Sequence, residues 1–212
     1  MDKPVFHSNS RRAVVARFGI HITGAWRQVL TTLSIVLPAL GITLIIMDVQ
    51  LGWFLIGLAA VPIMAYEWWK GELHHIPTGK DAPAIDALLS GDVLGQLKEK
   101  PTPHEIATAV GRVPGGQFFS VRFGITANTL LNIASDDEKD TEKVWQHALQ
   151  VREEAGSQHI NGAVLTVALL RSFDESESLL AHMHLGMDDL MAGIRWFDHL
   201  HALAEKAKAL KS

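Results

Sequence analysis

The chain has 212 residues, a formal net charge of −4 and no cysteine. This length suffices for one or two domains with a buried core, and the absence of cysteine excludes disulfide bonds and thiolate metal sites. The charge is uneven, because residues 1–28 carry a net charge of +4 whereas residues 75–212 hold 13 basic and 19 acidic side chains. The acidic part has no basic stripe with interleaved aromatic residues, which argues against nucleic-acid binding and favours contact of the basic segment with a membrane surface.

Residues 1–28 are the first segment, and basic and apolar side chains alternate between residues 11 and 28. This pattern is typical of an amphipathic helix that lies in a membrane interface, and it is equally compatible with a charged tail. Both interpretations stay open at the level of the sequence.

Residues 29–69 are predicted to form a helical hairpin that crosses a membrane twice. Residues 29–47 contain no charged side chain, and nineteen helical residues rise about 28 Å, close to the roughly 30 Å of a bilayer's hydrocarbon core. A second uncharged run extends from residue 51 to residue 66. The short connection between the runs requires antiparallel helices. Two buried helices of a soluble core are the alternative, but such helices rarely lack charge on every face.

Aromatic and basic residues give the predicted hairpin its orientation. Aromatic rings are expected at the two membrane interfaces, and the candidates are Trp26, Trp53, Tyr66, Trp68 and Trp69. Basic residues precede the first run and Lys70 follows the second. The positive-inside rule therefore predicts a two-pass protein of the cytoplasmic (inner) membrane with both termini in the cytoplasm and the lipid bilayer as a partner.

Residues 70–83 contain glycine and proline and are predicted to form a linker. The adjacent His74 and His75 point apart on most backbones, so we expect solvated histidines there rather than a metal site. From residue 84 to residue 203 the apolar pattern is helical throughout, and residues 204–212 are predicted to be a tail or linker. The predicted fold class is therefore all-α, with a two-helix transmembrane hairpin followed by a cytoplasmic helical domain.

Cap and turn residues delimit the helices of this domain. Thr102 and Glu105 form a capping box, in which the threonine accepts a backbone N–H and the glutamate returns to the N–H of the cap. Asn161 can cap a later helix, and Gly156 is the expected end of the helix that Thr141 begins. Loops or turns are further expected at Gly91, Gly115, Gly116 and Gly124.

An internal repeat is visible within the helical domain. TPHEIATAV followed by FFSVRFGITANTLLNIA resembles NGAVLTVALL followed by LLAHMHLGMDDLMAGI. Gly124 and Gly186 match at an offset of 62 residues, so a pseudo-duplicated four-helix unit is the simplest interpretation. If Gly186 holds a left-handed turn, Gly186→Val should strain the backbone and destabilise the domain by about 1–3 kcal/mol.

The second unit also resembles a known family. With EAGSQHI ahead of ALLR, then LL and LGMDDL, it resembles the amino-terminal double repeat of Clp-type AAA+ unfoldases, over roughly residues 84–203. The resemblance implies an all-helical, non-enzymatic domain that receives protein substrates or adaptors and precedes an ATPase ring, through which a Clp peptidase can be engaged. It also implies that Thr102, Glu105 and Asn161 stand at substrate- or adaptor-binding positions.

The chain departs from the family at these same positions. Where the family has Gly-Thr-Glu-His, this chain has Asn161 followed by Gly-Ala-Val, so the acidic residue that can bind phosphorylated arginine in some members is absent. Thr102 and Glu105 are shifted by one position relative to the family motif. We therefore expect these residues to serve as helix caps rather than as ligands for phosphoarginine.

Motifs of catalysis and of cofactor binding are absent from the sequence. Neither a G-x-x-x-x-G-K-[ST] phosphate loop nor a G-x-S-x-G nucleophile motif occurs, so no cofactor is expected. A metal hydrolase remains a weak hypothesis on His182, His184, Asp188, Asp189, Asp198, His199 and His201. Because positions i and i+2 of a helix lie about 200° apart, neither histidine pair can chelate through both members, and no metal site is expected.

The sequence thus predicts a binding module rather than an enzyme. The leading hypothesis is the membrane-anchored, substrate- or adaptor-binding N-terminal region of a Clp-type unfoldase that acts in protein quality control. The alternative is a stand-alone membrane adaptor or scaffold with no ATPase. The final residues, AEKAKALKS, resemble a linker and favour the first hypothesis.

Overall fold

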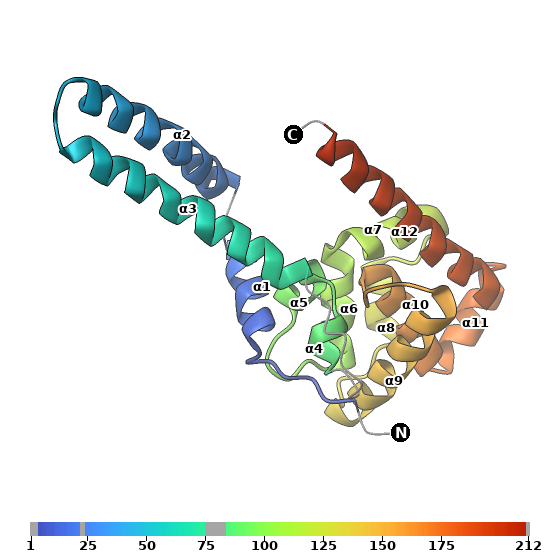
Figure 1. The fold of residues 1–212 in the computed structure, drawn as a ribbon. Coiled ribbons are helices and arrows are strands. Elements are labelled where there is room, and N and C mark those ends of the chain that lie inside the picture. Colours follow the sequence, from blue (N-terminus) through green and yellow to red (C-terminus); the bar gives the residue numbers. More distant parts are fainter. Residues whose placement is uncertain (1–3, 22–23, 75–83, 211–212) are drawn as a thin grey trace.

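The computed structural model describes residues 4–21, 24–74 and 84–210. Within these ranges the backbone alone is described at residues 20–21, 24–28, 30–31, 63, 65–74 and 208–209. The described secondary structure is helical apart from one isolated parallel bridge between Leu89 and Ile160. The predicted all-α class is therefore confirmed, and a pair of long helices projects from a helical body (Figure 1).

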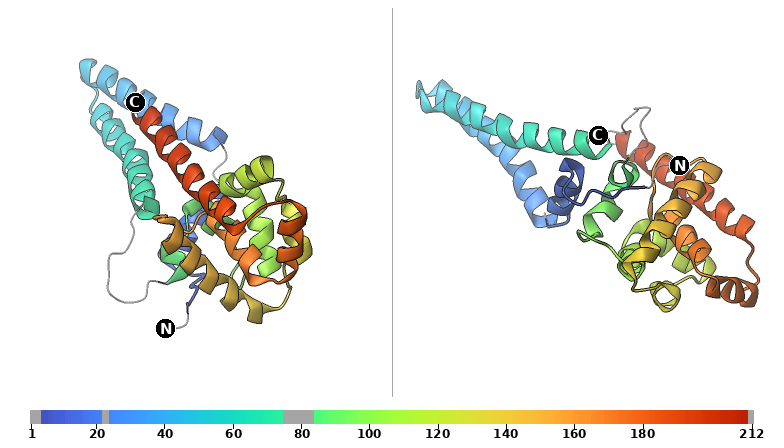
Figure 2. Two further views of the ribbon diagram at one scale, coloured as in Figure 1. Left: turned by 90° about the vertical axis from the view of Figure 1, so that its right-hand side faces the viewer. Right: turned by 90° about the horizontal axis from the view of Figure 1, so that it is seen from below.

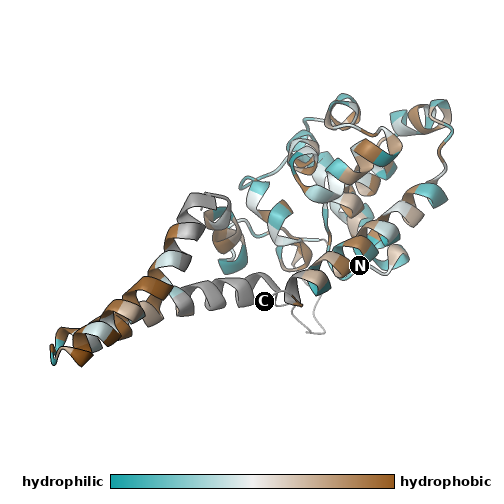
Figure 3. Cartoon of the chain, turned by 90° about the horizontal axis from the view of Figure 1, so that it is seen from above, coloured by the Kyte–Doolittle hydropathy of each residue, from teal (hydrophilic) through white to brown (hydrophobic). Residues whose placement is uncertain are grey.

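The projecting pair is an antiparallel hairpin of α2 (Gly24–Ile46) and α3 (Leu51–His74), which pack along each other. Figure 2 shows the pair from two further directions, and Figure 3 shows that apolar residues cover its outer end. Gly41 and Gly52 allow the two backbones to approach, because a Cβ at Gly52 would stand 2.5 Å from the carbonyl oxygen of Gly41.

The prediction that this hairpin crosses a membrane is wrong. Among the residues that the structure describes, no helix has the length and apolar character needed to cross a bilayer. The predicted two-pass location in the inner membrane, with both termini in the cytoplasm, is overturned with it.

The body of the molecule contains the remaining described helices, which surround one apolar core. In chain order these are α1 (Arg11–His21), α4 (Ile85–Leu88), α5 (Gly91–Gln96), α6 (Pro103–Arg112), α7 (Pro114–Phe123), α8 (Ala127–Ile133), α9 (Glu138–Ala155), α10 (Gly162–Ser172), α11 (Glu175–His182) and α12 (Met187–Ala209). Helix α12 therefore continues through much of the segment that was predicted to be a tail.

The helix α10 is the centre of the body. All of its residues are buried except Arg171, and it packs against α6, α7, α9 and α12. A helix that is apolar on every side is stable only when neighbours cover all of its faces. This position explains why α10 carries almost no polar residues.

The basic N-terminal segment belongs to the body, although the sequence suggested an interfacial helix or a free tail. Helix α1 packs against α4 and α5, and Ala13 and Ala16 are part of the core. The buried Arg12 donates hydrogen bonds to the carbonyl oxygens of Ala87 and Leu89. Because buried carbonyl groups require donors, these hydrogen bonds hold α1 against the body. The alternation of basic and apolar residues in the sequence suggested instead that this segment contacts solvent or lipid headgroups.

The expected helix ends are mostly present. The Thr102 hydroxyl accepts the N–H of Glu105 at 3.3 Å, Asn161 caps α10, and Gly156 ends α9 with a left-handed φ of 74°. Helix α9 begins at Glu138 rather than at Thr141, whose hydroxyl instead donates to the carbonyl oxygen of Pro101.

Two predicted turns are wrong. Gly115 and Gly116 are buried in the first turn of α7 rather than in a loop. In the second unit the left-handed residue is His184, with a φ of 54°, whereas Gly186 has no positive φ. The N–H of Gly186 is bound by the Asp189 carboxylate at 2.8 Å, so the strain expected for Gly186→Val has no basis, while Gly124 does hold a φ of 71°.

Candidate functional site

Asn161 is a structural residue at the start of α10. Its Oδ1 accepts the backbone N–H groups of Ala163 and Val164, both at 3.0 Å. Its Nδ2 donates to the Asp198 carboxylate on α12 at 2.8 Å, and the same carboxylate accepts the hydroxyl of Ser157. The side chain is therefore engaged within the fold, as the comparison with the family motif suggested for a cap.

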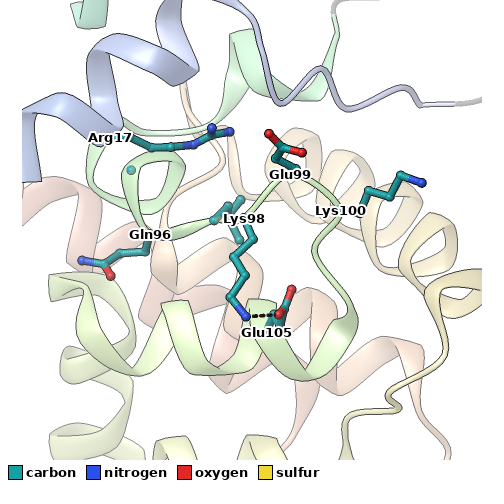
Figure 4. Close-up of a pocket in the computed structure, with 8 residues that line it drawn as sticks. Arg17, Gln96, Lys98, Glu99, Lys100 and Glu105 are labelled. Carbon is teal, nitrogen blue, oxygen red and sulfur yellow. Dashed lines mark hydrogen bonds and ion pairs between the residues drawn. The ribbon is translucent and has the colours of Figure 1, made fainter.

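Glu105 lies in the wall of a shallow, open pocket at the beginning of α6. Its carboxylate pairs with Lys98 at 2.5 Å and does not return to the N–H of Thr102, so only one half of the predicted capping box forms. Figure 4 shows the Lys98 side chain directed at Glu105 and that of Lys100 pointing away from the pair. The pocket has a volume of about 620 Å³ and is lined by Arg17, Gly95, Gln96, Leu97, Lys98, Glu99, Lys100 and Glu105.

The structure does not bring the three predicted binding residues together in one pocket. Glu105 lines the pocket, whereas Thr102 and Asn161 are not among its lining residues. The pocket is open, and its charged groups include the Lys98–Glu105 pair that already neutralises itself. This arrangement offers no enclosed site for a reaction and no set of convergent donors for a phosphate group.

The aromatic residues predicted for membrane interfaces do not form a site in the described structure. Trp53 is 69% exposed near the turn of the hairpin. The side chains of Trp26, Tyr66, Trp68 and Trp69 lie outside the described residues.

The histidines and aspartates near the C-terminus do not converge either. Across the described ranges, no group of three or more histidine, aspartate and glutamate side chains is placed to hold a metal ion. Asp189 binds the N–H of Gly186, and Asp198 accepts hydrogen bonds from Asn161 and Ser157. These aspartates therefore fix backbone turns and helix starts.

A hydrogen bond between His147 and Ser172 joins α9 to α10. The Nδ1 of His147 stands 2.9 Å from the hydroxyl of Ser172, which itself donates to the carbonyl oxygen of Ala168. Burial, followed by the positive charges of Lys143 and Arg171, lowers the pKa of His147 below its ordinary value of 6.5. The neutral imidazole is thus favoured in the folded protein, and its role there is structural.

The feature that sequence reasoning missed is an aromatic cluster between α7 and α12. Phe118 is its centre, and its ring centroid lies between 5.6 and 6.5 Å from those of its neighbours. The cluster consists of Phe118, Phe119, Phe123, Trp196 and Phe197. The recurrence of phenylalanine at helical spacing in α7 was the available signal, but the partner residues on α12 are far away in the sequence.

An exposed apolar stripe continues from this cluster along α12. We define the α12 stripe as Trp196, Leu200, Leu203 and Ala207. Trp196 and Leu200 are each 42% exposed and Leu203 is 48% exposed. Large apolar side chains that stay exposed along one side of a helix are typical of a surface that binds another protein, so the α12 stripe is the candidate functional site.

In comparisons with known proteins, no protein-family model, no curated protein and no solved structure matches the chain.

Proposed function

We propose that residues 84–203 form a protein-binding module that receives client proteins or their adaptors for a Clp-type unfoldase. The single observation that carries this proposal is the α12 stripe, an exposed apolar surface on an otherwise well-packed helical body. The resemblance of the second unit to the Clp amino-terminal repeat supports the same function, because that domain receives proteins and performs no chemistry itself.

The polar candidate residues are already paired within the fold, which favours recognition of a partner through apolar contact rather than through a charged pocket. Asn161 is occupied by the start of α10 and by Asp198, and Glu105 is paired with Lys98. We therefore assign the module no catalytic step, no cofactor and no phosphoarginine recognition.

Binding of an unfolded protein tests this function. The full chain should bind fluorescein-labelled lactalbumin that has been reduced and carboxymethylated, because this form exposes apolar segments, and fluorescence anisotropy would follow the binding. Native lactalbumin is the matched control, since it has the same sequence but a closed core. Equal anisotropy changes with the two forms would contradict a client-receiving function.

A stand-alone adaptor without an ATPase is the second candidate, and it would bind its partner through the same α12 stripe. The resemblance to a domain that precedes ATPase rings favours the unfoldase. The coding sequence beyond Ser212 decides between them, because a Walker A motif within roughly the next hundred residues identifies the unfoldase and its absence identifies the adaptor.

A further inference from the structure

The α12 stripe has the geometry with which one helix packs along another. Trp196, Leu200, Leu203 and Ala207 follow one another at intervals of four, three and four residues. Residues three and four apart lie on the same side of a helix, and alternation of these intervals is the pattern of a two-helix seam. The stripe therefore fits a partner helix better than an extended strand or a small ligand.

The body of the molecule covers only the start of this seam, where Trp196 packs against Phe118 of α7. On α12 the buried side chains are Leu190, Met191 and Ile194, all near its beginning, whereas every described side chain from residue 199 to residue 207 is exposed. Figure 1 shows this end of α12 extending beyond the body. A short helix without tertiary contacts is only marginally stable in water, so packing of a partner along the stripe would stabilise it.

The charges beside the seam are basic. The guanidinium of Arg122 lies over the ring of Trp196, 4.7 Å from its centroid. Lys206 precedes Ala207 and falls beside the stripe, whereas Glu205 falls on the opposite side of the helix, about 180° from Trp196 at 100° per residue. A second copy of the chain would bring the same basic border against itself, so charge disfavours self-association through this surface.

We propose that the α12 stripe docks an amphipathic helix of another protein, one whose apolar side is flanked by acidic side chains. Apolar contact with Trp196, Leu200 and Leu203 would supply most of the affinity. Pairing of acidic side chains with Arg122 and Lys206 would fix the choice of partner. This inference rests on the proposed function, because it names the surface through which the module would hold an adaptor.

A pair of designed peptides tests the proposal. Both are three-heptad helices with leucine at the seam positions, and they differ only in whether glutamate or lysine occupies the flanking positions. We expect the full chain to bind the fluorescein-labelled glutamate peptide at least about tenfold more tightly than the lysine peptide in fluorescence anisotropy. Raising the salt concentration should reduce this preference because it screens exposed charges.

Variants of the chain locate the binding surface. Leu203→Asn should weaken binding of the glutamate peptide by about tenfold or more, whereas Ala202→Asn, which places the same uncharged side chain on another side of the same helix, should leave it unchanged. The double variant Arg122→Glu, Lys206→Glu should bind the lysine peptide in preference. Circular dichroism confirms that each variant is folded before binding is measured.

Three outcomes would overturn the proposal. The two peptides could bind equally, Ala202→Asn could weaken binding as much as Leu203→Asn, or sedimentation could reveal a dimer that Leu203→Asn dissociates, in which case the occupant is a second copy. Binding of unfolded lactalbumin by a chain that ignores both peptides would reject the docked helix and leave the proposed function intact. Loss of lactalbumin binding with peptide binding retained would reject the client-receiving function instead.

Discussion

Asn161 shows how much structural work one polar side chain performs in this protein. It satisfies two backbone N–H groups of α10 and donates one hydrogen bond to Asp198 of α12. Free N–H groups at a helix start are costly when they are buried, so the side chain stabilises α10 and also joins it to α12. Both polar atoms of the Asn161 side chain are therefore used in hydrogen bonds within the fold.

Replacement of Asn161 separates these two roles. Asn161→Ala removes the cap and leaves Asp198 without one donor, so we expect a loss of about 1–2 kcal/mol in the free energy of unfolding. Asn161→Asp keeps a good cap but places a second carboxylate against Asp198, so it should also destabilise the protein. Urea denaturation measures both, and a stability of Asn161→Asp equal to that of the wild type would show that the bond to Asp198 contributes nothing.

Left-handed residues give a second prediction at this scale. Gly124→Ala forces a side chain into a φ of 71°, so we expect a loss of about 1 kcal/mol. His184→Gly makes the opposite change at a φ of 54° and should be neutral or stabilising by a few tenths of a kcal/mol. The two melting temperatures should therefore move apart, and a fall of both would exclude backbone strain as the cause.

At the scale of elements, the starts of α7 and α10 meet at a junction of glycines. A Cβ at Gly115 would collide with the backbone N of Ala163, and one at Gly162 would collide with a methyl group of Val113. Glycine at both positions therefore lets the two helix starts touch, which places α7 against the central helix. The pair Gly115–Gly116 suggests a loop in the sequence because glycine at a turn and glycine at a close approach have the same local signature.

Substitution at this junction should be costly. Gly162→Ala adds a methyl group where backbone and side chain already touch, so we expect a loss of about 1–3 kcal/mol, as for overpacking in other cores. Gly57→Ala is the control, since a Cβ there meets nothing within 4 Å and alanine favours a helix by up to about 1 kcal/mol. Denaturant midpoints that move equally for the two variants would contradict the close approach.

The contact between α9 and α10 should make stability depend on pH. Because the pKa of His147 is lowered from 6.5 in the folded state, the unfolded chain takes up the proton first as the pH falls. The stabilising contribution of the neutral imidazole is therefore present above pH 6.5 and is lost as the pH falls through the lower pKa of the folded state. We expect the difference in unfolding free energy between the wild type and His147→Gln to shrink between pH 7.5 and pH 5. A difference independent of pH would show that His147 keeps its ordinary pKa.

At the scale of the whole molecule, a segment from the beginning of the chain completes the body. Phe6 stacks on Trp145 of α9 at 5.8 Å between ring centroids, and the N–H of Ile85 donates to the carbonyl oxygen of Val5 at 3.0 Å. With Arg12 bound to the end of α4, residues on both sides of the projecting hairpin are held in one core. The hairpin therefore leaves the body between two segments that are each anchored to it.

Removal of the Arg12 side chain should release α1 from the body. Arg12→Ala leaves the buried carbonyl oxygen of Leu89 and the half-buried one of Ala87 without these donors, and an unsatisfied buried carbonyl costs about 1–3 kcal/mol. We expect faster tryptic cleavage within residues 11–21, with the core of α9 and α10 still protected. Val14→Ala, at a 53% exposed position of the same helix, is the control, and equal cleavage of the two variants would contradict an anchoring role for Arg12.

What could be predicted depended on the range of the interactions involved. The helical class, the caps at Thr102 and Asn161 and the helix end at Gly156 follow from the sequence by itself, because each depends on residues within a few positions of one another. The tertiary structure alone decided the attachment of α1, the glycine junction and the aromatic cluster, because the residues in contact there are distant in the chain. It also decided which side chains of α12 stay exposed and form the α12 stripe. Gly186 is an exception among the local features, because its similarity to Gly124 predicted a left-handed turn whereas the positive φ belongs to His184. Short-range hydrogen bonding thus determines where helices begin and end, whereas packing of distant side chains determines which of their surfaces remain free to bind.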